Sequence, residues 1–456
     1  MHLQYFILTS IRYKNEIKIV SKTLAIALNQ YYNKLINSKE KSLKKARGIK
    51  MKNQKVMSVA NDLGYGDVKI NIDDTYINQP SVVAEIQQVT SDPIDSSKEE
   101  TVAKVIENLL DNMDVTVDKK RYLVGNAASN STLPRKTFDI NSGSSKAETD
   151  LALILPLAMI AAKKIQESYE NEEDVFEPLK ADVVMTTALP ITEIGFGSTD
   201  TRDEFAKRFT AKKHIVIFNN FDNPISVTLS FKAVNVFKEG EVATAIAIPH
   251  GDSNLQNALI NDIKKNYPDQ SANAEHLIKD ARDVLGIDIG QGTTDLALTT
   301  KGKADVYNSE SIPEGYGTVL RRAWKFLPRM ENGFHLPDEV ALREILNSEP
   351  TNEIDRENKE TALKAIKTSV PSLVERIESG FNDALSANFD LEVVFIFGGG
   401  SIPLMQQTDL RQQLASALKR KRSKAIIVWV GEKYAQKLNE IGLKMLVDAL
   451  ASQYNK

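Results

Sequence analysis

The sequence predicts an α/β fold built from two similar lobes. A strand, a glycine turn and a returning strand occur twice, in Met57–Ile70 and in Val284–Leu298. Strand-like and helical segments occur together in each half of the chain, as they do in α/β proteins. In addition, three consecutive glycines, Gly398–Gly400, follow a buried strand-like segment. Open α/β sheets bind ligands beyond the carboxyl ends of their strands, so we expect the glycine turns to lie at one ligand cleft.

The composition excludes several classes of protein. The chain has 456 residues, 42% hydrophobic and 26% charged, which is typical of a soluble protein of two or three domains. It has no cysteine, which excludes disulfides, thiolate metal sites and a cysteine nucleophile. The histidines show no metal-ligand spacing, no apolar run is long enough to span a bilayer, and the start lacks a signal-peptide pattern. We therefore predict a cytoplasmic protein that does not bind membranes.

The first fifty residues differ from the rest in charge. Residues 1–53 contain twelve lysines and arginines and two glutamates, about +10, whereas the whole chain has a formal net charge of -3. The remainder therefore carries about -13. We predict that residues 1–50 are a basic extension, disordered or non-native, with the native start at Met51. A basic arm for an acidic surface or nucleic acid, and a partner-binding helix over Ile19–Ile36, remain alternatives.

The first lobe is expected over residues 51–282, with a small subdomain near residues 79–140. Alternating apolar residues predict its strands, and longer apolar periodicity predicts its helices. Ser91–Glu100 is polar and is expected to be mobile. The expected strands are Val56–Ala60, Asp67–Ile72, Ser81–Val89, Arg121–Val124, Ala181–Ala188, Ile215–Phe218 and Ile225–Lys238, and the helical segments are Thr149–Tyr169 and His250–Arg282.

The second lobe is expected over residues 283–430, and residues 431–456 are expected to form a closing helix that returns to the first lobe. The same patterns apply. The expected strands are Val284–Thr299, Ala304–Ser309, Val393–Phe397 and Ala425–Val430, and the helices are Tyr316–Phe326, Pro337–Ser348, Glu360–Leu385, Thr408–Lys421 and Lys433–Ser452.

The first glycine turn has the pattern Asp62-x-Gly64-Tyr65-Gly66, and Lys69 follows on the returning strand. Glycine lets a bare backbone bend tightly and bring its N–H groups against phosphate oxygens. Asp62 at the strand end can hold a hydrated divalent cation. Lys69 is placed to reach a β- or γ-phosphate as a point charge, although an exposed strand lysine is an equal alternative. These five residues are candidate nucleotide-binding residues.

The second glycine turn runs from Asp288 to Asp295. Its two threonine hydroxyls can donate to phosphate oxygens alongside the backbone N–H groups. Asp288 is expected to face the cation across from Asp62, and Asp295 to orient the turn or an attacking water. The candidate nucleotide-binding residues of this turn are Gly290, Gln291, Gly292, Thr293 and Thr294.

The third element is Gly398-Gly399-Gly400-Ser401, which follows the strand-like Val393–Phe397. Three glycines in a row leave room for a flat base or its ribose, so all four residues are candidates for nucleotide binding. No Walker Gly-x-x-x-x-Gly-Lys-Ser/Thr pattern is present, which disfavours a P-loop ATPase.

These three elements, in this order, resemble the phosphate-1, phosphate-2 and adenosine motifs of the actin/sugar-kinase/heat-shock ATPase superfamily. The resemblance extends from about Met57 to the end of the chain and implies an actin/heat-shock ATPase-like fold with two similar lobes around a nucleotide cleft. It also implies ATP or GTP with Mg²⁺ as cofactors, and Asp62 and Asp288 as metal-binding carboxylates.

Within the superfamily the chain is most similar to bacterial actins of the ParM type. Val183–Pro190 resembles their central strand, and Tyr434–Leu443 resembles their connecting helix. Val234–Glu241 resembles the segment that carries their catalytic acid, so Glu239 matches the residue that polarises the hydrolytic water. Lys238 stands where proline is common, and the stretch between Glu239 and the second turn is long, which predicts an insertion near residues 250–281.

The resemblance implies a polymerising ATPase whose filaments turn over with hydrolysis and segregate plasmid DNA. Glu239 and Asp295 would be its catalytic residues. Its partners would be further copies of itself and a DNA-bound adaptor of the ParR type, without direct sequence-specific contact to nucleic acid. A small-molecule phosphotransferase and a chaperone-like ATPase on the same fold remain alternatives. Light scattering with ATP or ADP would separate them.

Overall fold

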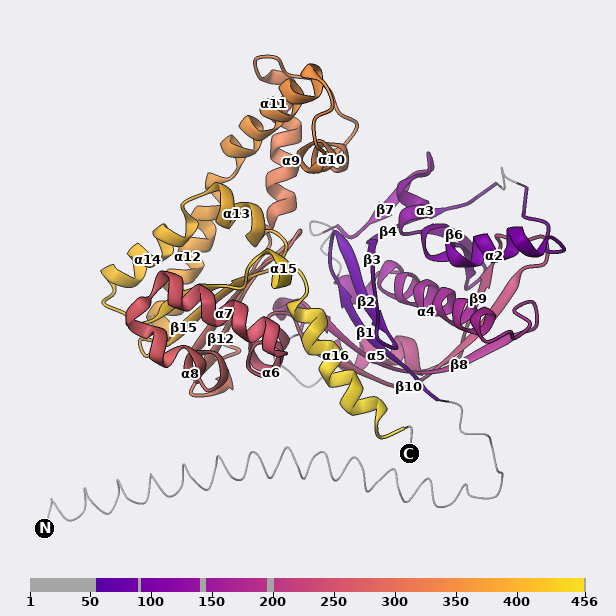
Figure 1. Cartoon of the computed structure of the whole chain (residues 1–456), viewed down its shortest axis with the longest axis horizontal. Coiled ribbons are helices and arrows are strands. Elements are labelled where there is room, and N and C mark those ends of the chain that lie inside the picture. Colours follow the sequence, from indigo (N-terminus) through magenta and orange to yellow (C-terminus); the bar gives the residue numbers. More distant parts are fainter. Residues whose placement is uncertain (1–54, 89–91, 140–144, 195–200, 455–456) are drawn as a thin grey trace, which may run out of the picture. The chain divides into compact units, whose positions relative to one another are not determined.

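The computed structural model of the chain describes residues 55–88, 92–139, 145–194 and 201–454 (Figure 1). Lys55–Lys456 form one compact unit. Residues 1–54 lie outside the described part, so the basic extension, the start at Met51 and the alternative helix over Ile19–Ile36 stay predictions. In the ranges given above, no helix combines the length and the apolar character needed to cross a membrane.

The first sheet contains ten strands among the described residues, in the order β3-β2-β1-β8-β10-β9-β5-β6-β4-β7. Strand β1 pairs antiparallel with β2 and parallel with β8, and β8 pairs parallel with β10. All residues of β1 are buried, as expected for a strand covered on both faces. The strands are β1 (Met57–Leu63), β2 (Asp67–Ile72), β3 (Thr75–Pro80), β4 (Val82–Glu85), β5 (Asp114–Val117), β6 (Lys120–Val124), β7 (Arg135–Thr137), β8 (Leu179–Leu189), β9 (His214–Phe218) and β10 (Ile225–Lys238).

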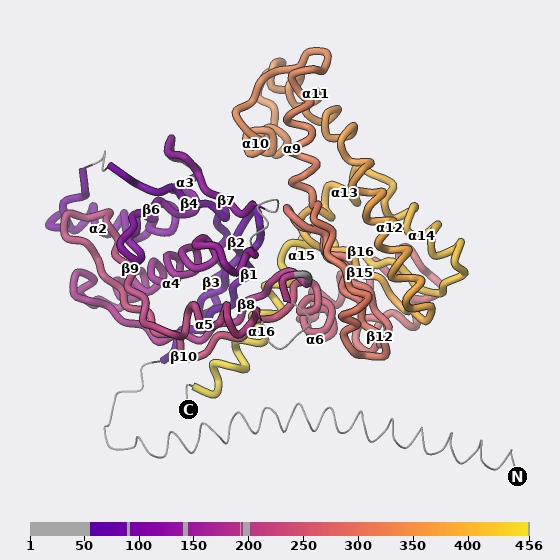
Figure 2. Tube along the Cα trace, turned by 180° about the vertical axis from the view of Figure 1, so that it is seen from behind, coloured from indigo at the N-terminus to yellow at the C-terminus, as the bar shows by residue number. Residues whose placement is uncertain are grey.

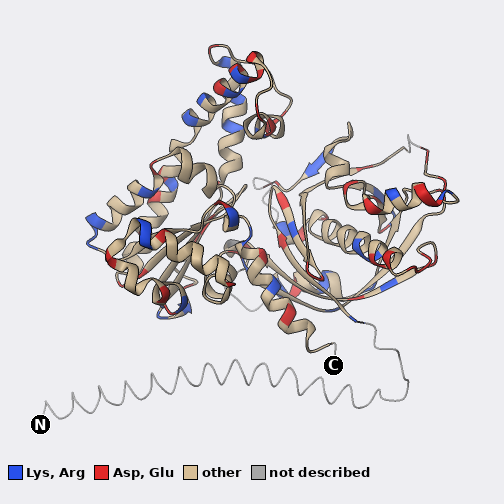
Figure 3. Cartoon of the chain, viewed as in Figure 1, with Lys and Arg blue, Asp and Glu red and all other residues tan. Residues whose placement is uncertain are grey.

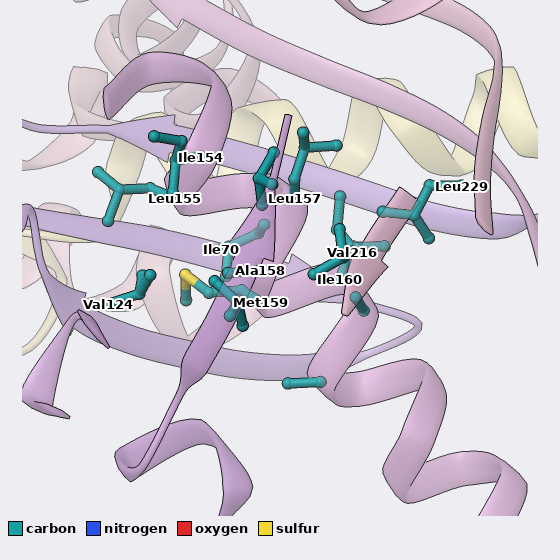
Figure 4. Packing of buried hydrophobic residues seen from close by; sticks show 14 of the residues in the cluster. Ile70, Val124, Ile154, Leu155, Leu157, Ala158, Met159, Ile160, Val216 and Leu229 are labelled. Atoms are coloured by element: carbon teal, nitrogen blue, oxygen red, sulfur yellow. The ribbon is translucent and has the colours of Figure 1, made fainter. Parts of the chain in front are cut away.

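Helix α4 (Leu151–Glu170) covers one face of this sheet and confirms the helix predicted over Thr149–Tyr169. Its apolar side chains share one core with side chains such as Ile70 of β2 and Val216 of β9 (Figure 4). The remaining helical segments of the first lobe are α2 (Glu99–Glu107), η1 (Leu109–Asp111), α3 (Asn126–Ser129), η2 (Lys146–Glu148), η3 (Ile191–Glu193) and α5 (Thr201–Thr210).

Two segments of the first lobe differ from the sequence-based expectation. In Ser91–Glu100, which was expected to be mobile, the described residues before α2 are mostly turn and coil, but Ile94 forms a β-bridge with Phe221 and α2 begins at Glu99. Helix α5 was not predicted, because only Phe205 and Phe209 of its ten residues are buried. Two apolar anchors are too few to make a helical period visible in a sequence.

The second sheet contains six strands among the described residues, in the order β13-β12-β11-β15-β16, with β14 paired to β12. Strands β11 and β12 form an antiparallel hairpin, while β11, β15 and β16 run parallel. The strands are β11 (Val284–Ile289), β12 (Thr294–Thr300), β13 (Lys303–Ala304), β14 (Glu310–Ile312), β15 (Val393–Phe397) and β16 (Ile426–Trp429).

Helices cover both faces of the second sheet (Figures 1 and 2). The side chains of β15 alternate between two cores: Val394 and Ile396 face the core that contains α9 and α12, whereas Val393 and Phe395 face the one that contains α7. The helical segments are η4 (Ala243–Ala247), α6 (Ile248–His250), α7 (Ser253–Asn266), η5 (Pro268–Asn273), α8 (Ala274–Lys279), α9 (Tyr316–Phe326), η6 (Leu327–Arg329), α10 (Glu339–Asn347), α11 (Glu353–Ser369), α12 (Pro371–Ala387), α13 (Ser401–Gln407) and α14 (Leu410–Arg420).

Several predicted boundaries in this half are wrong. Glu360–Leu385 is not one helix, because Pro371 cannot continue the hydrogen-bond ladder of α11 and instead begins α12. Most of Ala304–Ser309 is a turn rather than a strand, since only Ala304 belongs to β13.

The basic run at the end of α14, blue in Figure 3, places Lys419 and Arg420 in the last turn, where positive charges interact favourably with the helix dipole.

The chain returns to the first sheet through α15 (Glu432–Ala435) and α16 (Leu438–Ala451), which replace the single helix predicted over Lys433–Ser452. Helix α16 packs on β1 and β8 and crosses the chain just before η4, a π-helical turn. At the crossing, a Cβ on Gly442 would lie 2.5 Å from Val242 Cγ1, so glycine allows the close approach. The predicted lobe boundaries at residues 282 and 430 stay predictions.

Candidate functional site

The two glycine turns line one cavity of about 590 Å³. The β1/β2 hairpin pairs Leu63 with Val68, and the β11/β12 hairpin pairs Ile289 with Thr294, which confirms both predicted hairpins. The predicted site residues that line the cavity are Asp62, Gly64, Tyr65, Gly66, Lys69, Glu239, Asp288, Gly290, Gln291, Gly292, Thr293, Asp295, Gly398, Gly399 and Gly400.

Two predicted binding residues, Thr294 and Ser401, do not line the cavity. The Thr294 hydroxyl donates to the Glu314 carbonyl oxygen over 2.9 Å, and the Ser401 hydroxyl donates to the Gly398 carbonyl oxygen over 2.7 Å. Both hydroxyls are therefore bonded within the protein, where they hold the walls of the cavity together.

One lysine and one serine hold the first turn. Lys69 Nζ lies 3.4 Å from Asp62 Oδ2, and Ser81 bonds the carbonyl oxygens of Gly64 and Gly66 through its hydroxyl and its N–H. Burial alone would lower the pKa of Lys69, but the negative charges of Asp62 and Asp67 outweigh it and raise that pKa. Lys69 is therefore a permanent positive charge beside the turn.

Among the described residues, no lysine or arginine forms an ion pair with Asp288 of the second turn, although the more distant charge of Lys69 lowers its pKa. Asp288 Oδ2 accepts a hydrogen bond of 2.7 Å from the side-chain amide of Asn439 on α16, and Asn439 Oδ1 accepts from the Gly240 N–H. Burial, together with the negative charge of Asp295, raises the pKa of Asp288 to about 7. A neutral amide orients the Asp288 carboxylate without compensating its charge.

The glycine loop after β15 packs directly on the second turn. Gly398 has φ +84°, in the left-handed region that glycine favours, and a Cβ there would overlap the carboxylate of Asp288. The Gly400 N–H donates to the Ile289 carbonyl oxygen over 2.7 Å. The close approach at Gly398 requires a residue without a Cβ, and a Cβ on Gly400 would lie 2.8 Å from Ile289 Cγ2.

Glu239 follows the last residue of β10, and its N–H donates to the carbonyl oxygen of Leu189 at the end of β8. The register of β10 against β8 thus places the Glu239 side chain at the cavity. Its carboxylate lies 2.9 Å from Nζ of Lys146, a residue that sequence reasoning missed. Burial raises the pKa of Glu239 to about 8 despite the opposing effect of Lys146, with Asp295 and Asp62 adding to the rise.

Comparison with known proteins identifies the family of one domain. Residues 60–241 match the model of the actin-like proteins N-terminal domain. This match covers both the first glycine turn and Glu239. Residues 60–241 therefore belong to the family of actin-like N-terminal domains. No curated protein matches it in sequence.

Solved structures of actin-like proteins share the fold of this chain over most of its length. It is similar to the actin-like protein Alp7A, with 19% identity and a TM-score of 0.57 over 86% of this chain and 96% of that one. It is also similar to the non-polymerisable quadruple mutant of pCBH ParM, with 16% identity and a TM-score of 0.52 over 86% of this chain and 99% of that one. The archaeal actin homolog Ta0583 has 16% identity and a TM-score of 0.53 over 87% of this chain and 100% of that one. The prediction of the actin-like fold is confirmed.

The cavity has an excess of negative charge. Among its lining residues, six carry carboxylates and two, Lys69 and Arg343, carry positive charges. One buried oxygen, Asp295 Oδ1, has no hydrogen-bond partner. A polyphosphate would be repelled from such a cavity unless a cation accompanied it, and carboxylate oxygens are ligands that Mg²⁺ prefers.

The metal would depend on its phosphate ligand. In the described ranges, no three His, Asp or Glu side chains gather closely enough to hold a metal ion by themselves. Magnesium at nucleotide sites typically takes one or two carboxylates, with water and phosphate oxygens completing its shell. Asp62 and Asp288 fit that limited role.

The outer wall of the cavity comes from residues that the sequence did not mark. They project from α9, α10, α13 and the segment before α16, and they combine apolar, aromatic and amide side chains, as ligand pockets usually do. No short motif joins them, so only the fold brings them together. They include Tyr316, Leu320, Arg343, Leu346, Asn347, Ile402, Pro403, Gln406, Gln407 and Gln436.

Proposed function

We propose that this protein binds and hydrolyses ATP, or GTP, with Mg²⁺ in this cavity, and that it forms dynamic filaments that segregate plasmid DNA. One observation carries the proposal: two glycine turns from two different sheets line a single cavity together with Glu239. The archaeal homolog Ta0583 is known in complex with ADP, at 16% identity and a TM-score of 0.51. A nucleotide is therefore the ligand that the cavity's chemistry favours.

The residues divide the work of phosphoryl transfer, which needs positioning and charge stabilisation more than covalent help. The backbone N–H groups of the two turns bind phosphate oxygens, whereas the Thr293 hydroxyl donates to Asp295 Oδ2 over 2.9 Å. Lys69 adds a positive charge beside them. When bound, Mg²⁺ neutralises charge on the β- and γ-oxygens. Glu239 orients a water molecule toward the γ-phosphate and accepts its proton, so it must be ionised to act.

Hydrolysis can act as a timer because the γ-phosphate connects the two turns. Its loss removes the ligand that both hairpins share, which lets the lobes shift and changes the surfaces that contact neighbouring subunits. An adaptor of the ParR type bound to plasmid DNA would then attach the DNA to the filament. The protein itself would act in the cytoplasm without membrane contact.

The test is the Glu239→Gln variant. We expect it to bind Mg-ATP as tightly as the wild type but to release phosphate about 10²–10⁴-fold more slowly, because a water-orienting base contributes about that much. Filaments followed by light scattering should then last longer after a fixed pulse of ATP. Glu241→Gln is the matched control, since Glu241 is two residues away, pairs with Lys238 over 3.5 Å and does not line the cavity.

Two outcomes would contradict the proposal. Phosphate release at the wild-type rate in Glu239→Gln would remove Glu239 from the mechanism and leave Asp295 as the next candidate. ATP turnover without any ATP-dependent scattering or pelleting would favour a phosphotransferase or a chaperone-like ATPase over a filament.

A further inference from the structure

A lysine is buried directly behind the catalytic wall of the cavity. The side chain of Lys146 is 0% exposed, and Lys146 does not line the cavity. Its Nζ donates to Glu239 Oε1 over 2.9 Å and to the carbonyl oxygen of Leu63 over 2.6 Å. The same atom lies 4.3 Å from the centre of the Tyr65 ring. Two of the three donors of the ammonium group bind these oxygens, and the face of the Tyr65 ring attracts its positive charge.

The backbone around Lys146 is fixed from two sides. The carboxylate of Glu193 accepts from the Ser145 hydroxyl and from the N–H groups of Lys146 and Ala147. On the other side, the Arg208 guanidinium on α5 donates to the carbonyl oxygens of Ala147 and Thr149. Segment η2 is thus held by η3 and by α5, so Lys146 enters the core from a rigid support rather than from a loose loop.

The contacts of Lys146 connect two parts of the proposed site. Leu63 is the last residue of β1, and Tyr65 lies inside the first glycine turn and lines the cavity. Glu239 comes from the end of β10, on the far side of β8 from β1. A single ammonium group therefore joins the first turn to the carboxylate that orients water.

We propose that Lys146 is a positioning residue for nucleotide hydrolysis, which fixes the orientation of the Glu239 carboxylate and couples it to the first glycine turn. This inference rests on the proposed function, because it assigns Lys146 a role through Glu239. The rotation of a free carboxylate would spread its oxygens over several orientations, whereas a bond to Oε1 selects one. The positive charge of Lys146 also lowers the pKa of Glu239, against the rise caused by burial, Asp295 and Asp62.

The test is a double-mutant cycle with Lys146→Met and Glu239→Gln. Methionine keeps the length and apolar stem of lysine but cannot donate a hydrogen bond. We expect Lys146→Met to lower kcat about 10- to 100-fold, as a general base loses its positioning, and to leave KM and Mg-ATP affinity within about threefold. In the Glu239→Gln background the same change should alter kcat less than about twofold, because coupled residues are not additive.

The pH profile separates positioning from mere packing. The charged groups that act on Glu239 are Lys146, Asp295 and Asp62, while Glu193 and Tyr65 act on Lys146 itself. Removal of the lysine charge leaves Glu239 facing carboxylates alone, so the acid limb of kcat in Lys146→Met should move to higher pH. Lys164→Met is the matched control, because Lys164 also pairs with a glutamate, Glu173, over 3.7 Å but does not line the cavity.

Stability measurements keep the test decisive if the variant folds poorly. Lys146→Met leaves Glu239 buried without a partner and should lower the melting temperature, whereas adding Glu239→Gln removes both charges and should restore most of it. An unchanged kcat in Lys146→Met, or an equal loss in both backgrounds, would overturn the inference. If the wild-type protein releases no phosphate, the proposed function fails and not the inference about Lys146. In that case, melting-temperature changes of the two single variants that simply add in the double variant would refute the contact between Lys146 and Glu239.

Discussion

The two glycine hairpins share one backbone pattern but differ in their charge. In the first, Asp62 has a lysine partner, Lys69, on the returning strand, and Lys146 supports the turn from behind. In the second, Asp288 accepts from the neutral amide of Asn439 and Asp295 accepts from the Thr293 hydroxyl. The first hairpin is compensated by the protein, whereas the second is left negative.

This difference indicates which hairpin an external cation would bind. A buried carboxylate without a cation favours its protonated form, as the raised pKa of Asp288 indicates. A divalent cation that arrives with phosphate would supply the missing positive charge. We therefore expect the second hairpin to respond to Mg²⁺, and the first hairpin to be largely assembled before any ligand binds.

The largest expected effect comes from removing each aspartate in turn. Asp288→Asn should weaken Mg²⁺-dependent nucleotide binding about tenfold or more, since one charged contact contributes about 1.5–3 kcal/mol. The same change should raise the melting temperature of the ligand-free protein at pH 8, because it removes an uncompensated buried charge. Asp62→Asn should lower that melting temperature, because Lys69 loses its partner.

Calorimetry with and without Mg²⁺ and thermal unfolding at pH 8 measure these effects. Changes of the same sign in the ligand-free stability of both variants would contradict the proposed difference between the hairpins.

A second pair of variants, Gly64→Ala and Gly66→Ala, tests whether the two hairpins contact each other. A Cβ on Gly64 would lie 2.5 Å from the backbone oxygen of Asp67 in the same hairpin, so Gly64→Ala should lower the free energy of unfolding by about 1–3 kcal/mol. A Cβ on Gly66 would instead lie 2.9 Å from Cγ of Gln291 in the other hairpin. Gly66→Ala should therefore weaken nucleotide binding more than stability.

The control lies across the cavity. Gln291→Ala removes the Cγ atom that the methyl group of the Gly66→Ala variant would strike, so the double variant should recover nucleotide affinity relative to Gly66→Ala alone. Urea unfolding and nucleotide titration follow the two effects. Equal loss of stability in Gly64→Ala and Gly66→Ala would show that the contact between the hairpins does not matter.

The smallest expected effect concerns Glu440 on α16, which is buried near the first hairpin. Burial, with Asp62 adding to it, raises the pKa of Glu440 to about 7 even though a hydrogen bond with Asn71 lowers it. The native state therefore keeps a proton that the unfolded chain loses above about pH 4.5. The contribution of Glu440 to stability is complete below that pH and is lost as the pH rises to about 7, at up to about 1.4 kcal/mol per pH unit.

Glu440→Gln cannot titrate, so its free energy of unfolding should depend less on pH between about 4.5 and 7. Urea unfolding of both proteins at several pH values in that window measures the difference in slope. Parallel curves for the wild type and the variant would mean that Glu440 is ionised throughout.

Local chemistry made much of the site predictable. An Asp-x-Gly-x-Gly pattern followed by a returning apolar strand encodes a hairpin with exposed N–H groups, so both turns were found from the sequence. Glu239 was found only through its resemblance to a family segment. Lys146 carried no signal, since its partner Glu239 lies 93 residues away and nothing near Lys146 marks it as buried.

The errors in the fold have similar causes. Pro371 is a visible helix start, yet the apolar period continues through it and suggested one helix where α11 and α12 meet. The outer wall of the cavity was missed because α10 and α13 contribute single side chains that only packing brings together.

The sequence alone determined the α/β class, the two hairpins and the glycine loop, because turn geometry and strand alternation depend on neighbouring residues. Only the tertiary structure decided how charge is shared between the hairpins. Whether an aspartate meets Lys69 or Asn439, and whether Lys146 faces Glu239, depends on strand register and helix packing over long separations. Burial then increases the energy of each of these interactions, since charges interact more strongly where water is excluded.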